Sequence, residues 1–422
     1  MNLLQQRINK EKAKATLDNN NYDALNLSPE ISALLKAKDA IISLQQKQLD
    51  ALEDEPFNFQ QMLLLPGEIS TYKSRNDVDL HVSFSFAHSE KQASFIPVVA
   101  SNMDTIGTLA MADVLRQKEM FTCLHKFHET KKLTQYFSSL KANDPKAFEY
   151  FAISTGISDQ DYRRTEYIME KNPELQYICV DVANGYMEAL DKFVKKVRKR
   201  FPETTIFVGN VVDAKRTKDL IEIGADAVKV GIGPGSVCTT RQEAGVGALQ
   251  GSAIVDCAYG VHELGYGHII SDGGCTNAGN ISQACACGAD MIMLGGLLSG
   301  HKECFEGEPK IKIDSYGKEW VEFYGMSSYK AMQNHYKDCE KRMEYRGSEG
   351  RAILVEYKGP VINTVNALLG GMRSAITYTG VSGLRDLRKA EYQILHDGNN
   401  GLNLSLATKS PLFEMNVHQC TR

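Results

Sequence analysis

The chain has 422 residues, 48 lysines and arginines, 52 aspartates and glutamates, a net charge of −4 and a pI near 6.2. With no basic excess and no outstanding basic cluster, this composition argues against binding to nucleic acid or to a membrane surface. No apolar run approaches the ~20 residues of a membrane span. Because Met1–Lys14 is polar rather than a secretory signal, we expect a cytoplasmic protein whose ten cysteines stay reduced.

Residues 1–56 differ from the rest of the chain. Ser28 and Pro29 are a favourable N-cap and first helical residue, and apolar residues then recur at helical spacing as far as Leu52. We predict a helix of several turns that ends before Pro56. This helical extension could pack on the main domain, pair with a copy of itself or bind a partner, and nothing in it suggests chemistry.

From residue 57 to 395, short apolar strands alternate with amphipathic helices such as Tyr186–Arg200 and Ala214–Ile223. About eight such units in one domain predict an α/β fold, the (β/α)8 TIM barrel, whose site is built from loops at the carboxyl ends of the strands. A doubly wound open sheet is the alternative, but its functional residues gather at one switch point, whereas here they follow many strands. The predicted strands are Ile96–Ser101, Phe121–Leu124, Phe151–Ser154, Tyr177–Val182, Thr205–Val208, Ala227–Val230, His268–Ser271 and Met291–Leu294.

Charged and turn-forming residues follow the eighth predicted strand. We interpret Gly300–Tyr324 and then Gly325–Pro360 as a short flap, an excursion over the mouth of the barrel. Val361–Arg373 is expected to be the last barrel helix. The Asn-, Gly- and Ser-rich residues 396–422 are expected to form a flexible tail.

One loop, residues 230–241, reads VGIGPGSVCTTR and cannot be helical, because three glycines and a proline lie within five residues. Its cysteine, Cys238, is flanked by hydroxyls and followed by Arg241. A thiol on such a loop is suited to be a nucleophilic thiolate, although a buried packing cysteine is the alternative interpretation of a lone cysteine. Cys285 and Cys287, one residue apart in an apolar helix, are interpreted as packing thiols rather than a zinc site.

Two adjacent strand ends carry paired glycines. Gly273-Gly274 follows the seventh strand and Gly295-Gly296 follows the eighth, where barrels commonly hold a phosphate with backbone N–H groups. Asp272 could accept hydrogen bonds from ribose hydroxyls or could cap a turn. Polar residues also follow earlier strands, which is consistent with one shared pocket, although turn capping explains each of them alone. They lie at Ser101–Thr105, His125-Lys126, Asp181–Gly185 and Gly209–Val211.

Several separate motifs together resemble the IMP dehydrogenase / GMP reductase family. The motifs are SNMDT, DVANG, GNVV, GIGPGSVCTTR, SDGGC, MLGG, FYGMSS, EYRGSEG and LGGMRSAITYTG, and the resemblance spans roughly Thr71 to Leu387. Within the family, the chain is more similar to the GMP reductase branch. The interval from Lys126 to Asp181 leaves no room for the regulatory CBS pair of the dehydrogenases, Ser328–Tyr345 lacks their Arg-Tyr pair, and EYRGSEG is close to the reductase form.

The resemblance implies a reaction, a cofactor and an assembly. The reaction is NADPH-dependent reductive deamination of GMP to IMP and ammonia through a covalent thioimidate on Cys238, with Thr240 and Glu349 delivering a proton to the departing amine. The resemblance also implies a homotetramer, and a K⁺ ion held by carbonyl groups of the cysteine loop.

Binding residues are implied by the same resemblance, position by position. For K⁺ they are Gly233, Gly235 and Cys238, with Arg241 nearby. For the nucleotide they are Ser236, Asp272, Gly273, Gly274, Gly295, Gly296, Gly325, Met326, Ser327, Arg346, Gly347, Ser348, Glu349 and Gly350. For the cofactor they are Ser74, Arg75, Lys126, Asp181, Val182, Ala183, Gly231, Ile232, Met326, Tyr345, Arg346 and a turn formed by Ser374, Ala375, Ile376 and Thr377.

The chain departs from the reductase pattern in two places, and two other functions remain open. Gln242, Glu243, Ala248 and Leu249 replace a basic pair and a Tyr-Pro, and Lys302–Ile313 replaces a Gly-rich turn. The nearest alternative function is NAD-dependent IMP dehydrogenase, which shares every step through the thioimidate. An alternative of another class is a nucleotide-binding protein without turnover, with the N-terminal helix as its output.

Overall fold

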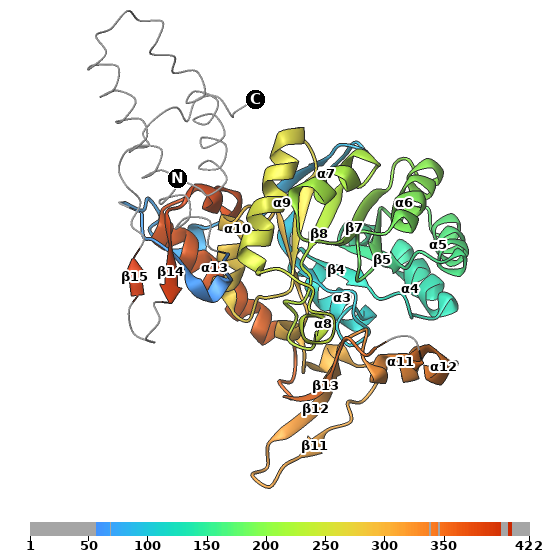
Figure 1. Ribbon diagram of the computed structural model, residues 1–422. Coiled ribbons are helices and arrows are strands. Elements are labelled where there is room, and N and C mark those ends of the chain that lie inside the picture. The colour runs from blue at the N-terminus through green and yellow to red at the C-terminus, as the bar shows by residue number, and fades with distance from the viewer. Residues whose placement is uncertain (1–55, 68, 337–338, 345–346, 398–403, 407–422) are drawn as a thin grey trace, which may run out of the picture.

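The computed structural model describes residues 56–67, 69–336, 339–344, 347–397 and 404–406 (Figure 1). The helix predicted within residues 1–56 therefore lies outside the described residues, as do Tyr345, Arg346 and most of the predicted tail. The described residues form a barrel with a ribbon of strands that projects from it.

Eight parallel strands close into the barrel. In chain order they are β3 (Lys91–Ala100), β4 (Met120–Leu124), β5 (Phe151–Thr155), β6 (Tyr177–Asp181), β7 (Thr205–Val211), β8 (Ala227–Val230), β9 (His268–Asp272) and β10 (Met291–Leu294). Each strand pairs with the next, and β10 pairs back with β3, for example Ile292 with Val98. This closing pair confirms the predicted (β/α)8 barrel and excludes the open sheet, and each predicted strand overlaps an observed one.

Helices connect the strands and surround the barrel (Figure 1). Ser158 begins α5 by accepting from Asp161 N–H, and Asp213 begins α7 by accepting from Arg216 N–H, as N-caps do. The helices are α3 (Leu109–Arg116), α4 (Thr130–Asn143), α5 (Asp159–Lys171), α6 (Glu188–Arg200), α7 (Ala214–Glu222), α8 (Thr240–Glu243), α9 (Gln250–Leu264), α10 (Ala278–Ala286) and α13 (Ile362–Thr379). Among the described residues, no helix combines the length and apolarity that crossing a membrane requires.

Aromatic rings fill the barrel interior. The ring of Phe121 lies 5.0 Å from that of Tyr177 and 5.7 Å from that of Phe207, centroid to centroid. Phe86 ends β2 (Val82–Phe86), which pairs antiparallel with β3, and its ring lies edge-on to Tyr177 at 6.1 Å. All four rings are at most 1% exposed. The strands are therefore apolar on both faces, because one face meets this core and the other meets helices.

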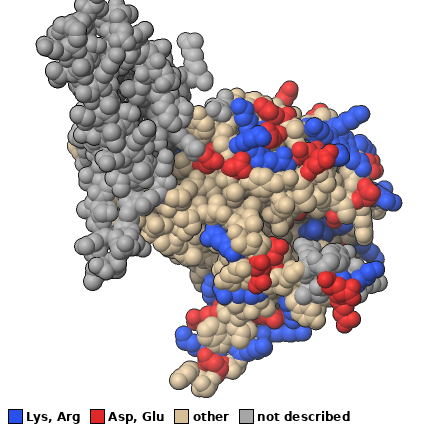
Figure 2. Space-filling view, viewed as in Figure 1, with Lys and Arg blue, Asp and Glu red and all other residues tan. Residues whose placement is uncertain are grey.

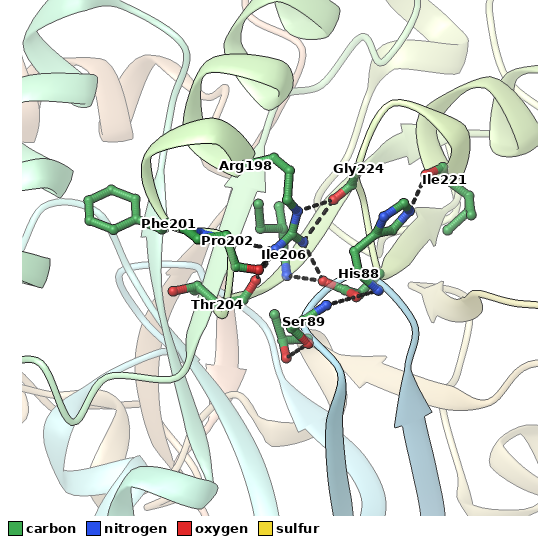
Figure 3. Close-up of polar contacts among 11 residues, drawn as sticks. His88, Ser89, Arg198, Phe201, Pro202, Thr204, Ile206, Ile221 and Gly224 are labelled. Carbon is green, nitrogen blue, oxygen red and sulfur yellow. Dashed lines mark hydrogen bonds and ion pairs between the residues drawn. The ribbon is translucent and has the colours of Figure 1, made fainter.

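One buried carboxylate ties the β2–β3 hairpin to the barrel (Figure 3). Asp226, directly before β8, is 1% exposed. One of its oxygens accepts from the backbone N–H groups of His88 (3.0 Å) and Ser89 (3.2 Å). The other accepts from Ile206 N–H (2.9 Å) and from the Arg198 guanidinium (2.5 Å). The charge of this carboxylate is thus compensated from three separate segments of the chain.

The segment after β10 is an antiparallel ribbon of three strands, which corrects the turn-rich excursion predicted for Gly300–Tyr324. Its strands are β11 (Lys312–Ile313), β12 (Glu319–Tyr324) and β13 (Ala352–Glu356), with helices α11 (Tyr329–His335) and α12 (Cys339–Met343) between β12 and β13. Exposed and partly buried residues alternate along β13. The first four residues of β13 are apolar, yet none of its residues is buried, whereas the barrel strands are buried on both faces.

The last barrel helix is longer than predicted. α13 continues to Thr379 and ends at Gly380, whose φ of +70° is left-handed. The residues 374–377 are therefore helical rather than a turn. Beyond them, β14 (Tyr392–Asp397) pairs with β1 (Met62–Leu64) and with β15 (Leu404–Leu406), so the predicted tail begins inside a strand.

Charges of both signs are interspersed over the helices on the face shown in Figure 2, and the middle of that face is mostly uncharged. Such mixing matches the near balance of 48 basic and 52 acidic residues in the chain.

Asp226→Asn should destabilise the protein strongly. An amide cannot offer two charged acceptor oxygens, and Arg198, whose side chain is 15% exposed, would lose its counter-charge. Breaking a buried pair in this way costs about 3–5 kcal/mol. We expect a lower urea midpoint for this variant, while Glu222→Gln, at an exposed position of α7, should leave the midpoint unchanged. Equal midpoints for the two variants would contradict the assignment.

Candidate active site

Two segments far apart in the sequence meet beside the loop that follows β8. Thr239 N–H donates to the Glu349 carbonyl and Arg351 N–H donates to the Val237 carbonyl, both at 3.0 Å. These bonds place Cys238 opposite Gly350 in an antiparallel bridge. The cysteine loop is thereby fixed against the segment that leads into β13.

Cys238, Thr240 and Glu349 form a chain of hydrogen bonds. The Cys238 sulfur lies 3.2 Å from the Thr240 hydroxyl, which donates to a Glu349 carboxylate oxygen at 2.8 Å. A hydroxyl has only one proton to donate, so Thr240 accepts from the thiol. The three residues predicted to be catalytic are therefore together, and the thiol proton has a route through Thr240 to Glu349. Cys238 is partly exposed, so a ligand can reach it.

Close packing requires glycine at two positions of the cysteine loop. A Cβ at Gly233, where φ is +86°, would lie 2.4 Å from Cγ of Arg241. A Cβ at Gly231, where φ is +145°, would lie 2.3 Å from the Asp272 carbonyl oxygen. Arg241 itself donates to the Ala248 carbonyl. The loop thus packs its bare backbone directly against Arg241 and the end of β9.

Carbonyl groups of this loop fit a monovalent cation in part. The Gly235 carbonyl accepts from Cys238 N–H at 3.1 Å. The Cys238 carbonyl, by contrast, accepts neither of the two hydrogen bonds that form the bridge to Gly350. Backbone carbonyls of this kind are ligands that K⁺ uses.

His125, His128 and Glu306 also group three possible metal ligands, but their arrangement does not suit a metal ion. The two imidazole rings stack with centroids 3.6 Å apart and 22° between their planes. Their in-plane lone pairs therefore run side by side instead of converging on one point. Lys132 lies 2.8 Å from Glu306 and already supplies its counter-charge.

The predicted phosphate residues come together at the ends of β9 and β10. Gly273 and Gly274 both have left-handed backbones, with φ of +88° and +83°. A Cβ at Gly296 would lie 2.5 Å from the Ser236 hydroxyl oxygen, and one at Gly273 would lie 3.4 Å from Gly235 N. Gly273 and Gly296 thus lie close against the cysteine loop, and backbone N–H groups with the Ser236 hydroxyl are available there to hold an anion.

Lys229, in the middle of β8, is a functional residue that the sequence analysis missed. It is 1% exposed, and its ammonium pairs with Asp181 and lies 3.3 Å from Asp272. Burial alone would lower the pKa of Lys229, but the two carboxylates raise it well above its ordinary value. Burial alone would likewise raise the pKa of Asp181, and Lys229 instead holds it below its ordinary value. A lysine within the apolar strand Ala227–Val230 was the signal for such a pair.

Asn210, at the end of β7, binds both Asp272 and the start of the cysteine loop. Its side-chain amide donates to Asp272 Oδ2 and to the Gly231 carbonyl, both at 2.9 Å. Asp272 is therefore held from two directions, by Lys229 and by Asn210. One of its oxygens carries both contacts, so the carboxylate is fixed in orientation.

The segment after β12 also reaches the site. A Cβ at Gly325 would lie 2.9 Å from the Val237 carbonyl oxygen and 3.4 Å from Cα of Gly350. Met326 and Ser327 follow and are partly exposed. Ser348 accepts from Tyr329 N–H at 3.2 Å, which joins the start of α11 to the Gly347–Gly350 segment.

Residues predicted to bind the cofactor fall into two groups. Lys126, Asp181, Val182, Ala183, Gly231 and Ile232 lie at or just beyond the ends of β4, β6 and β8, beside the site. The second group is Ser74, Arg75 and residues 374–377, and its hydrogen bonds among the described residues are local. Ile376 is fully buried within α13. The structure therefore brings the first group to Cys238 but not the second.

The fold defines a (β/α)8-barrel protein, and its candidate active site is centred on Cys238. A family profile described as "IMP dehydrogenase / GMP reductase domain" matches residues 56–418. The GMP reductase of Onchocerca volvulus is 47% identical over 342 residues, which are 81% of this chain and 91% of the relative. Human GMP reductase 2 is 46% identical over 336 residues, 80% of this chain and 93% of the relative. The GMP reductase of Shigella boydii is 44% identical over 337 residues, which are 80% of this chain and 94% of the relative.

The chain belongs to the IMP dehydrogenase / GMP reductase family.

Lys229→Met should destabilise the protein at pH 7.5 by at most about 3 kcal/mol. This is the lower end of the cost of breaking a buried ion pair, because the side chains of Asp181 and Asp272 are 31% and 22% exposed. The loss should shrink as the pH falls to 5. In the wild type the pKa of Asp181 lies below its ordinary value, so the contribution of Asp181 to the free energy of unfolding stays constant between pH 7.5 and 5. In the variant, burial without Lys229 raises the pKa of Asp181, and proton uptake by Asp181 then stabilises the folded state.

Urea midpoints measured at pH 7.5 and pH 5 check this expectation. Lys199→Met, at an exposed position of α6, is the matched control and should not alter the midpoint. A Lys229→Met deficit that stays constant or grows towards pH 5 would show that the lysine does not compensate the two carboxylates.

Cys238 should be the thiol that reacts first with iodoacetamide at pH 7.5. Burial raises the pKa values of Cys285 and Cys304 to about 12, so both remain protonated and enclosed. Peptide mapping by mass spectrometry in a Cys420→Ser background would identify the labelled residue, since Cys420 lies outside the described residues. Labelling of Cys285 or Cys304 before Cys238 would contradict the burial seen here.

Proposed function

We propose that this protein is a cytoplasmic, homotetrameric enzyme that converts GMP to IMP and ammonia, with NADPH as the hydride donor. The balanced reaction is GMP + NADPH + H⁺ → IMP + NH₃ + NADP⁺. The observation that carries the proposal is the hydrogen-bonded chain of Cys238, Thr240 and Glu349. The similarity to GMP reductases over about four fifths of the chain supports the choice of substrate.

In the first step, the Cys238 sulfur bonds to C2 of the purine and the bond from C2 to the exocyclic nitrogen breaks. The thiol proton passes through Thr240 to Glu349, and the same pair returns it to the departing amine, which leaves as ammonia. Cys238 is then joined to the base as a thioimidate, so one difficult displacement becomes two easier steps.

In the second step, the bond between C2 and Cys238 is replaced by a bond from C2 to hydrogen. NADPH supplies the hydride for this step when it is bound. Cys238 departs as the thiolate and takes up the proton that balances the reaction. Lys126 and Asp181, at the ends of β4 and β6, would face the cofactor.

The remaining site residues bind and orient the nucleotide. Ser236 and the paired glycines would hold the phosphate through a hydroxyl and backbone N–H groups. Asp272, held in place by Lys229 and Asn210, would accept from ribose hydroxyls. Met326 would lie against the base. A K⁺ ion on the carbonyl groups of Gly233, Gly235 and Cys238 would order the loop that carries the nucleophile.

Absorbance at 340 nm with purified protein, GMP and NADPH, with and without K⁺, tests the proposal. We expect loss of NADPH with one ammonia released per NADPH, and no turnover by Cys238→Ser, because the sulfur forms the covalent bond. NADH production from IMP and NAD⁺, without consumption of NADPH, would instead assign the chain to the dehydrogenase branch. Absence of both activities in a protein that binds GMP would favour the role without turnover.

A further inference from the structure

A buried carboxylate, together with the tyrosine and histidine that bind it, lies beside the proposed site and has no part in the chemistry described so far. Its centre is Asp104, in the loop after β3, whose side chain is only 7% exposed. One carboxylate oxygen accepts from the hydroxyl of Tyr324 at 2.8 Å and from Nε2 of His335 at 2.5 Å. The other oxygen is buried and has no hydrogen-bond partner among the described residues.

A carboxylate buried this deeply requires a compensating partner. Within the described part of the chain, His335 is the ionisable group at ion-pair distance from Asp104. Burial and the neighbouring Asp104 raise the pKa of Tyr324, so its hydroxyl stays protonated and continues to donate. The two donors come from β12 and α11, on either side of the segment that holds Gly325, Met326 and Ser327.

Asp104 also contacts this segment directly. Its backbone N–H donates to the sulfur of Met326 at 3.3 Å. The same tyrosine hydroxyl that Asp104 binds accepts from the Asn334 side chain at 2.9 Å. Three consecutive parts of the flap, the end of β12, Met326 and the end of α11, are thus fastened to one residue of the barrel.

The far side of His335 is fastened to a second barrel loop. Its ring stacks on that of Phe127, with centroids 3.7 Å apart and 8° between the planes. Phe127 follows Lys126, whose ammonium lies 5.4 Å from the Phe127 ring centre. His335 is therefore clamped between the loops after β3 and β4.

We infer that Asp104 and His335 are positioning residues, whose pair holds the Gly325–Ser327 segment so that Met326 lies correctly against the purine bound beside Cys238. This inference rests on the proposed function. The residues that would hold the phosphate and ribose, at the ends of β9 and β10, touch neither member of the pair. Loss of the pair should therefore slow the reaction more than it weakens nucleotide binding.

His335→Phe tests the pair, because phenylalanine keeps the stacking on Phe127 but cannot donate to Asp104. We expect kcat to fall about 100-fold, the loss typical of an ångström-scale displacement, with KM for GMP within about threefold of the wild type. His335→Gln keeps a donor and should recover most of the activity. Asp104→Asn combined with His335→Phe should lose no more than the worse single variant, because both act through one contact.

Amide hydrogen exchange of Gly325–Ser327 gives a readout that does not depend on turnover. It should be faster in His335→Phe, normal in His335→Gln, and normal in Gln333→Ala, an exposed position on the same helix. Faster exchange with an unchanged kcat, a rise in KM alone, or no rescue by His335→Gln would overturn the inference.

The proposed function can fail separately. If the wild type consumes no NADPH with GMP, that function falls, and the pair is judged by exchange alone. If amide exchange of Gly325–Ser327 is then unchanged in His335→Phe, the pair does not hold the flap and the inference is overturned. If exchange is faster in His335→Phe and normal in His335→Gln, the inference is supported.

Discussion

The active site depends on the short antiparallel bridge between the cysteine loop and the segment before β13. Two backbone hydrogen bonds of 3.0 Å place Cys238 opposite Gly350. Without them the loop would still pack on Arg241 and the end of β9, but it would lose its backbone connection to the segment that carries Glu349. The bridge converts a flexible loop and a remote carboxylate into one hydrogen-bonded unit, so the barrel and the flap are joined at the reacting atom.

A second feature of the site is a buried ion pair in the barrel, formed by Lys229 with Asp181 and Asp272. Lys229, on β8, neutralises carboxylates at the ends of β6 and β9, so one buried ammonium links three of the barrel strands. A lysine is tolerated at 1% exposure because both partners lie beside it. The same pairing holds Asp272 in place as an acceptor next to Gly273 and Gly274.

The flap is held at two places that do different things. At the bridge it supplies Glu349, the residue that we propose receives the thiol proton. At the Asp104 cluster it is fastened by a buried acid to the loop after β3, and by ring stacking to the loop after β4. A segment held at both ends over a barrel can present Met326 to a ligand at low entropic cost, because its backbone is already ordered before a ligand arrives.

The sequence by itself determined the barrel and the family to which the chain belongs. Buried strands read as apolar runs, and a cysteine on a loop of glycines and proline is distinctive, so the strands, Cys238, Thr240, Glu349 and the paired glycines could be predicted. The ribbon of β11–β13 was not predicted, because β11 has only two residues and charged residues interrupt the apolar ones of β12. Only the tertiary structure decided which polar residues are partners. Lys229 with its two aspartates, and Asp104 with His335, pair across long separations in the chain, and the choice between a buried ion pair and a solvated side chain is made by the packing around it.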